Sequence, residues 1–193
     1  MKEKHAFLIM AHSDPYLLKI QVKLLDYYKN DIYIHIDKKG VNMFNLDEIR
    51  KTTVHSNIYI YFEFNIYWGH DSQVKCELFL LEKAASKNYN YYHLLSGADL
   101  PIKSQIEIHN FFDFNKGKEF VQFYSNELIL SNRKWISLYH FLQKFQKVSR
   151  FRIINLFFKN LEKLSLLFQE YVLKVNRLDK GFNFQKGATW FSI

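Results

Sequence analysis

The chain begins with an apolar run that gives way to turn-forming and capping residues. The run from His5 to His12 is almost entirely apolar and is followed by Ser13, Asp14 and Pro15. A continuous apolar run of this length predicts a strand buried on both faces, as in a parallel sheet. Ser13 or Asp14 can cap a following helix, and proline suits the first turn of a helix. A strand and then a helix are therefore expected.

This order of strand and helix repeats downstream. Ile32, Ile34 and Ile36 alternate with other residues before Asp37, which is the period of a strand. The expected elements are strands within 30–40, 57–64 and 89–102, a helix over 70–88, and a helix over 104–114 with a capping box of Ser104 and Glu107. This alternation predicts an α/β fold with a Rossmann-type, mostly parallel sheet and helices on both faces.

The pattern weakens in the second part of the chain. A short strand is predicted over 119–124, two longer helices over 133–147 and 157–175, and a last strand in the closing run "KGATWFSI". No turn or polar tail follows that run, so it is either an edge strand or the point at which a longer protein has been cut. No repeat, low-complexity tract or linker separates the parts, which predicts one domain over 1–193.

Composition limits the class of protein. At 193 residues and 48% hydrophobic, the chain can bury a core of ordinary size, which excludes disorder as its main state. Cys76 is the single cysteine, so a disulfide framework and a cysteine zinc cluster are excluded, and a buried thiol in a reducing compartment is expected. No apolar run is long enough to span a bilayer or resembles a signal peptide. The sequence thus predicts a cytoplasmic protein.

The net charge of +8 indicates an anionic partner or a strongly solvated surface. Basic and aromatic residues alternate from Arg133 to Lys163. Nucleic acid, anionic lipid headgroups and a phosphorylated substrate are all compatible with such a segment. Helices with solvated basic faces and core aromatics are compatible with it too, so the charge alone leaves these interpretations open.

Candidate ligand residues lie where the predicted strands end. In open parallel sheets, ligands bind beyond the carboxyl ends of the strands. The residues at those ends are His12, Ser13, Asp37, Lys38, Ser96, Gly97 and Asp99. Asp37 can accept hydrogen bonds from a ribose or a base, and the two lysines after it can neutralise phosphate. A strand-end turn with solvated charges is the alternative.

The loop "SGADLP" is the second candidate. Ser96, Gly97 and Ala98 are small enough for the backbone to approach a ligand closely, and Asp99 can bind hydroxyl groups. Pro101 fixes the end of the loop. A structural loop with a capping aspartate is the alternative.

Trp68 and His70 precede the helix predicted over 70–88. His70 and Asp71 could form an acid/base pair, but Asp71 or Ser72 is more often an ordinary helix cap. Trp68 can stack on a sugar ring or fill a corner of the core.

Motifs for several other chemistries are missing from the sequence. No G-x-G-x-x-G or G-x-x-x-x-G-K-[ST] follows a predicted strand, which leaves no sign of a classical dinucleotide site or a P-loop. The sequence has no H-E-x-x-H, no D-x-D and no paired Cys/His spacing. The sequence therefore gives no positive indication of a catalytic metal.

Five segments together resemble one family of enzymes. "AHSDPYLL", "YIHIDKK", "YWGHDSQVKCELFLLEKA", "YYHLLSGADLPIKSQIEIHNFF" and "KGATWFSI" occur in the order seen in the core-2/I-branching β-1,6-N-acetylglucosaminyltransferases, a family that also contains peptide O-xylosyltransferases. Within them, "LLSGADLPIKS" resembles the family signature SGxDxPI. The resemblance extends from His5 to Ile193.

The resemblance implies a GT-A-like fold and an inverting glycosyltransferase of bacterial type. Such an enzyme transfers a sugar, here expected to be N-acetylglucosamine, from a UDP-sugar to a hydroxyl of a glycan or lipid-linked glycan. It implies no metal or other cofactor, because family members lack a working D-x-D site and neutralise the donor diphosphate with basic side chains. Surface polysaccharide synthesis at the inner face of the plasma membrane is the expected setting, with contact to anionic lipid and none to nucleic acid.

Site residues follow from the same resemblance. The residues matched to donor binding are His12, Asp37, Ser96, Gly97 and Asp99, with Asp37 near the uridine. The residues matched more loosely to acceptor binding are Glu127, Arg133, Lys134 and Trp190.

The closing run resembles the family strand GSxWFxLxR. In the family, that strand precedes the glutamate that acts as general base and the basic residues that hold the diphosphate. The resemblance therefore places the base beyond Ile193 and implies a sheet that is incomplete at its C-terminus, in a chain that is inactive alone. An inactive fragment that keeps part of the nucleotide-sugar site and a basic membrane-surface protein are the two alternatives.

Overall fold

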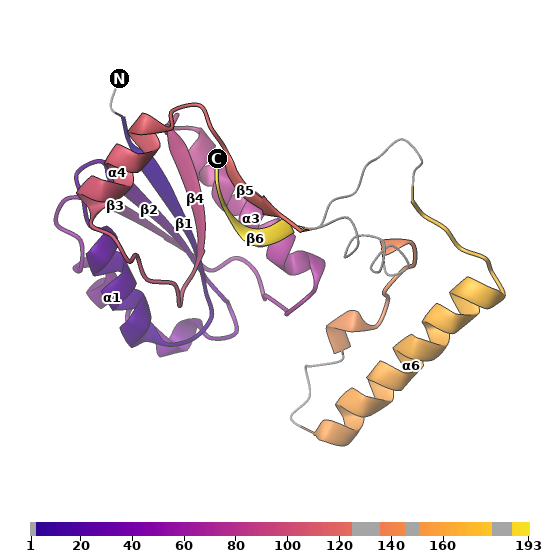
Figure 1. Cartoon of the computed structure of the whole chain (residues 1–193). Coiled ribbons are helices and arrows are strands. Elements are labelled where there is room, and N and C mark those ends of the chain that lie inside the picture. The colour runs from indigo at the N-terminus through magenta and orange to yellow at the C-terminus, as the bar shows by residue number, and fades with distance from the viewer. Residues whose placement is uncertain (1–2, 125–135, 146–150, 179–186) are drawn as a thin grey trace. The chain divides into compact units, whose positions relative to one another are not determined.

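The computed structural model describes residues 3–124, 136–145, 151–178 and 187–193 (Figure 1). The chain forms two compact units. The first comprises Met1–Ile66, Asp71–Val121 and Thr189–Ile193, and the second comprises Tyr67–His70 and Gln122–Ala188.

The first unit contains strands and helices in the order that the sequence predicts. Its strands are β1 (His5–Ala11), β2 (Asn30–Ile36), β3 (Asn57–Tyr61) and β4 (Tyr91–Ser96), and its helices are α1 (Pro15–Leu25), α2 (Leu46–Arg50), α3 (Asp71–Ala85) and α4 (Gln105–Phe114). The short 3-10 helix η1 (Val41–Met43) and α2 have no counterpart among the predicted elements. β3 ends at Tyr61, three residues earlier than predicted, and α3 is shorter at both ends.

The sheet has six strands in the order β3-β2-β1-β4-β6-β5, where β5 is Phe120–Phe123 and β6 is Gly187–Ser192. β1 runs parallel to β2 and β4, and β2 runs parallel to β3. β6 runs antiparallel to β4, with His93 opposite Ser192. The predicted α/β fold with a mostly parallel, GT-A-like sheet is confirmed, and the closing run forms an interior strand.

Helices cover both faces of the sheet because β1 and β2 are apolar on both sides. Figure 1 shows α1 and α4 on one face and α3 on the other. Phe7 and Ile9 of β1 pack with Leu18 of α1, whereas Leu8 packs with Leu80 of α3. Successive strand residues point to opposite faces, so one strand supplies both clusters.

The helix caps predicted for α1 and α4 are both present. Asp14 caps α1 by accepting a hydrogen bond from the backbone N–H of Leu17 at 2.9 Å, and it does so in a left-handed conformation with φ of 55°. Ser104 and Glu107 form the predicted capping box at the start of α4. These caps satisfy amides that the first turn of a helix leaves unpaired.

A buried polar network lies at the amino ends of the strands. His5 Nδ1 and His93 Nε2 are 3.0 Å apart, and the rings of His5 and His109 stack with centroids 4.0 Å apart. His109 Nε2 lies 2.7 Å from Asn30 Oδ1, and His93 Nδ1 lies 2.8 Å from Ser192 Oγ. Burial, reinforced by neighbouring positive groups, lowers the pKa of His5 to about 3 and that of His109 to about 4. Neutral imidazoles therefore form part of the core.

The second unit contains the 3-10 helix η2 (Gln143–Phe145) and the long helix α6 (Arg152–Tyr171). The helix predicted over 133–147 is wrong over residues 137–142, which are not helical and are followed by η2. Its residues 133–135 and 146–147 lie outside the described residues. α6 corresponds to the helix predicted over 157–175 but begins at Arg152 and ends at Tyr171. Within the described residues, no helix is both long and apolar enough to cross a membrane.

Candidate functional site

The carboxyl ends of three strands meet at one edge of the sheet in the first unit. The backbone N–H of Asp37, just after β2, donates to the carbonyl of Ala11 at the end of β1, at 2.7 Å. On the other side of β1, the backbone N–H of Gly97, just after β4, donates to the carbonyl of Met10 at 2.9 Å. The loops that carry the predicted donor residues therefore start on either side of the end of β1.

Asp37 is buried and holds the loop that follows β3. Its Oδ1 accepts hydrogen bonds from the backbone N–H groups of Lys39 at 3.1 Å and Ile66 at 3.2 Å. Its Oδ2 lies 3.3 Å from Nζ of Lys39, which also donates to the carbonyl of Ile66. The carboxylate thus makes the contacts of a strand-end turn, which was the structural alternative. Binding of a uridine by Asp37 stays a prediction.

His35, which the sequence reasoning missed, holds the same loop. Its Nε2 accepts a hydrogen bond from the backbone N–H of Phe64 at 3.1 Å, and its ring stacks on that of Phe64. Burial lowers the pKa of His35, although the charge of Asp37 opposes this. The neutral imidazole is the form that can accept this bond. The one available signal was a histidine at an inward position of an otherwise apolar strand.

Gly40 brings the turn after β2 against the end of β1. A Cβ at Gly40 would lie 2.9 Å from Cε of Met43 and 3.1 Å from the carbonyl oxygen of His12. The side chain of His12 itself is exposed. Lys38, next to the turn, is also exposed, and its amino group forms no ion pair with any residue that the structure describes. Both side chains are accessible to a ligand at this edge.

Gly97 permits a close approach between the loop after β4 and β1. A Cβ at this position would lie 2.8 Å from Cβ and 2.9 Å from Cα of Ala11. The backbone of Gly97 therefore packs against protein on this side, and its small size fixes how the loop leaves the sheet.

Ser96 and Asp99 close a tight turn at the end of β4. The backbone N–H of Ser96 donates to Oδ2 of Asp99 at 2.8 Å, and the N–H of Asp99 is 3.2 Å from the carbonyl oxygen of Ser96. The N–H of Ala98 donates to Oγ of Ser96 at 3.2 Å. Across the described residues, Oδ1 of Asp99 accepts no hydrogen bond, so the turn leaves one carboxylate oxygen for a ligand.

Gln21 is a second residue that the sequence reasoning missed. It is completely buried on α1, and its Nε2 donates to the carbonyl of Ser96 at 2.9 Å. This bond joins the helix after β1 to the loop after β4. A glutamine on an amphipathic helix usually signals a solvent-exposed position, so periodicity gives little warning of this role.

Trp190 lies on β6 and is 39% exposed. Because β6 is antiparallel to β4, residues before Ser192 lie toward the carboxyl end of β4, where Ser96 stands. Trp190 is thus closer to the donor loops than Ser192 is. Trp68 is 75% exposed, so it does not fill a corner of the core.

Three predicted acceptor residues cannot be placed. Glu127, Arg133 and Lys134 lie outside the described residues. In the described parts of the chain, no three side chains of His, Cys, Asp or Glu are grouped so that they could hold a metal ion.

Comparison with known proteins identifies the family. A family model described as Core-2/I-Branching enzyme matches residues 5–193. A search of curated proteins found no match. The family match covers β1 and both of the loops that meet at its end, and its range agrees with the resemblance seen in the sequence. The chain therefore belongs to the Core-2/I-branching enzyme family of glycosyltransferases.

Proposed function

We propose that the chain binds a UDP-sugar at the edge formed by the ends of β1, β2 and β4. The observation that carries this proposal is the pair of backbone hydrogen bonds that join Asp37 to Ala11 and Gly97 to Met10. They place two loops with polar side chains beside one strand end, which is where open α/β sheets bind nucleotides. Membership of a glycosyltransferase family makes a nucleotide-sugar the expected ligand.

The turn after β2 takes the nucleotide in this proposal. Asp37 is buried, and its carboxylate orders the turn. In this proposal the same carboxylate contacts the uridine. His12 and Lys38 are exposed beside it, and Lys38 supplies a positive charge that can meet the diphosphate. A lysine in this role agrees with transfer that needs no metal.

The turn after β4 takes the sugar. Oδ2 of Asp99 is held by the backbone of Ser96, and Oδ1 is left to accept a hydrogen bond from a sugar hydroxyl. Gly97 keeps this turn close to β1 and so close to the nucleotide. N-acetylglucosamine is the sugar that we assign to the site.

The acceptor in this proposal is a hydroxyl of a glycan, free or lipid-linked, in surface polysaccharide synthesis. Its oxygen attacks the anomeric carbon, the bond from that carbon to UDP breaks, and a base takes the proton of the hydroxyl. Attack opposite the departing UDP inverts the anomeric carbon. Trp190 has the exposed ring that stacking on an acceptor sugar requires, and Glu127, Arg133 and Lys134 are assigned to the same acceptor.

Thermal unfolding with UDP, UDP-N-acetylglucosamine and UDP-xylose tests the proposal. Stabilisation follows affinity, so UDP should raise the Tm, and UDP-N-acetylglucosamine should raise it more than UDP-xylose does. Asp37→Asn keeps an oxygen for the N–H groups of Lys39 and Ile66 but removes the charge. We expect it to weaken UDP binding about tenfold or more, in line with the loss of one charge-assisted hydrogen bond.

Asp47→Asn is the matched control, because Asp47 is an exposed carboxylate on α2. Its UDP affinity should equal that of the wild type. A wild-type chain that no UDP compound stabilises would overturn the proposal, and so would equal UDP affinities for Asp37→Asn and the wild type.

A further inference from the structure

Helix α6 attaches to its own unit through polar side chains. Gln169 is buried, its Nε2 donates to the carbonyl of Tyr139 at 2.9 Å, and its Oε1 accepts from the N–H of Tyr139 at 2.8 Å. One side chain thus replaces both backbone partners of a residue that lies in no helix or strand. This contact fixes which side of α6 faces residues 136–145.

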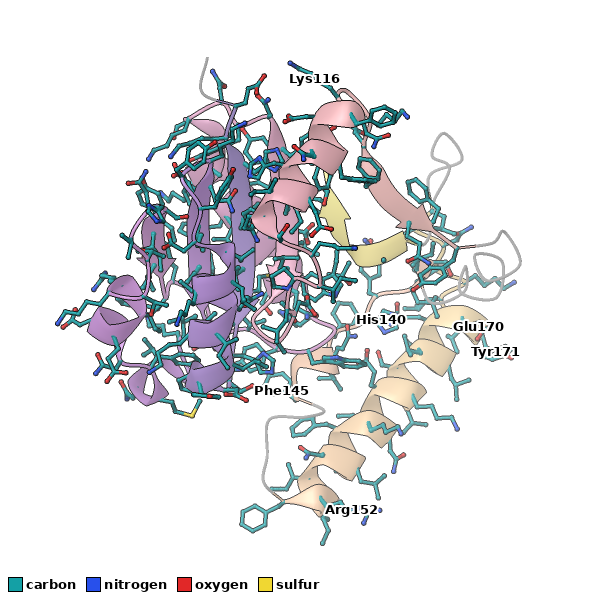
Figure 2. All side chains as sticks on the ribbon, turned by 60° about the vertical axis from the view of Figure 1, so that its left-hand side comes forward. Lys116, His140, Phe145, Arg152, Glu170 and Tyr171 are labelled. Carbon is teal, nitrogen blue, oxygen red and sulfur yellow. The ribbon has the colours of Figure 1, made fainter. Side chains whose placement is uncertain are left out.

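Glu162 and Phe158 lie on the same side as Gln169. Oε2 of Glu162 accepts from the N–H of Leu142 at 2.8 Å, and Oε1 lies 3.3 Å from Nδ1 of His140. The ring of Phe158 stacks on that of Phe145 in η2, with centroids 5.3 Å apart. Figure 2 labels His140 and Phe145, which contact α6, and the two ends of that helix, Arg152 and Tyr171.

A second side of α6 is apolar and exposed. Its large side chains recur every three or four residues, which places them on one face of a helix. They are Ile153, Phe157, Leu161, Leu164, Phe168 and Tyr171, all exposed. The fractions reach 82% for Ile153, 59% for Phe157 and 63% for Leu164. In a water-soluble protein, such an apolar face would be expected to pack against its own unit. Here the buried side chains of Glu162 and Gln169 bind residues 139–142 instead, and the apolar face stays exposed.

Basic side chains form a border beyond one edge of this apolar face, with the exposed Leu156 between them and the face. Arg152, Lys159 and Lys163 are exposed and lie within a narrow arc at 3.6 residues per turn, next to Leu156. None of the three forms an ion pair with a residue in the described ranges. Beside them, a pocket of about 400 Å³ is lined by Lys159, Lys163 and His140, together with Glu162, whose Oε2 accepts from the N–H of Leu142. This border is suited to an anionic group.

We propose that α6 lies in the plane of an anionic membrane surface, with its apolar face in the acyl boundary and its basic border at the headgroups. A helix with Phe and Leu on one side and Lys and Arg along the polar side is the pattern of helices that lie in the interface. Its 20 residues give an apolar face about 30 Å long. The proposal rests on α6 alone, so vesicle binding and donor binding can succeed or fail separately.

Sedimentation of the full chain with vesicles tests this proposal. We expect binding to phosphatidylcholine vesicles that contain about 30% phosphatidylglycerol, weakened by added salt, and much weaker binding to phosphatidylcholine alone. The double variant Phe157→Glu/Leu164→Glu should lose at least about tenfold in affinity, because two exposed apolar side chains no longer enter the lipid. Lys159→Glu/Lys163→Glu should lose about fivefold or more per residue on anionic vesicles only.

Ile102→Glu/Phe114→Glu is the matched control, since these side chains are 95% and 89% exposed in the first unit. It should bind vesicles as the wild type does. Circular dichroism establishes that each variant is folded, and Phe157→Ser/Leu164→Ser replaces the glutamate variant if that one is not. Failure of the wild type to bind any vesicle would overturn the proposal. Unchanged vesicle binding by Phe157→Glu/Leu164→Glu would also overturn it. If, in that case, the wild type forms a dimer and this variant does not, the apolar face is assigned to contact with a second copy of the chain.

Discussion

His35 and Asp37, two residues apart at the end of β2, hold the same loop by its backbone. Nε2 of His35 accepts from Phe64 at 3.1 Å, and Oδ1 of Asp37 accepts from Ile66 at 3.2 Å. Residues two apart on a strand point to the same side, so the two acceptors act together. The edge that we assign to the donor is therefore ordered by a neutral imidazole and a carboxylate.

Replacing His35 should loosen this loop to a degree that depends on whether the new side chain can accept the hydrogen bond from Phe64. His35→Leu removes the partner of the Phe64 N–H and should cost about 1–3 kcal/mol of unfolding free energy. His35→Gln can present an amide oxygen near the place of Nε2 and should recover part of that loss. Urea unfolding measures both variants, and equal losses would show that the hydrogen bond to Phe64 contributes little.

Gly97→Ala should destabilise the first unit by steric conflict with Ala11. The new Cβ would lie 2.8 Å from Cβ of Ala11, so the loop or β1 must shift, at a cost of about 1–3 kcal/mol. The penalty should shrink when Ala11→Gly is also present, which a double-mutant cycle by urea unfolding measures. An equal penalty in both backgrounds would show that the conflict is with the backbone of Ala11 and not with its Cβ.

The histidine network should make the fold less stable in mild acid. Burial lowers the pKa of His5 to about 3 and that of His109 to about 4, against an ordinary value of 6.5. Below pH 6.5 the unfolded chain binds protons that the folded chain does not, so stability falls as the pH falls toward 4. Each histidine adds a slope that approaches about 1.4 kcal/mol per pH unit.

Urea unfolding between pH 7.5 and 5 measures that slope. His109→Gln keeps a donor for Asn30 but cannot bind a proton in this range. Its unfolding free energy should therefore fall less steeply with pH, by up to the contribution of one histidine, about 1.4 kcal/mol per pH unit. A stability that is constant from pH 7.5 to 5 in the wild type would contradict the buried neutral network.

Cys76 should be unreactive in the folded protein. It is completely buried on α3, and burial, with smaller effects from the charges of Asp37 and Glu77, raises the pKa of its thiol to about 12. Reaction needs the thiolate, so labelling by an aromatic disulfide reagent should be slow in buffer and fast in urea. Fast labelling without urea would show that α3 opens.

The sequence predicts the first unit well because its signals are local. The apolar runs in β1 and β2 and the caps at Asp14 and Ser104 each lie within a few residues of the element that they define. The position of Asp37 and the Gly97 loop at the same edge of the sheet also follows, since parallel strands end at one edge. The family resemblance is confirmed over residues 5–193.

What the sequence does not predict depends on partners that are distant in the chain. The helix expected over 133–147 is absent from 137–142, where Gln169 binds Tyr139 and Glu162 binds Leu142. Gln21 and His35 are buried polar residues whose partners, Ser96 and Phe64, lie 75 and 29 residues away. Local periodicity carries no information about such bonds.

Hydrogen exchange of the full chain with and without UDP-N-acetylglucosamine tests the assigned donor site most directly. Ligand contact should slow the exchange of backbone amides in residues 37–40, 62–66 and 96–99, because these three loops meet at the end of β1 or are held by Asp37. Amides of α6 should not change. Protection confined to other segments, such as the small pocket lined by Lys4, Asn57 and Lys87 at the opposite end of the strands, would contradict the assignment.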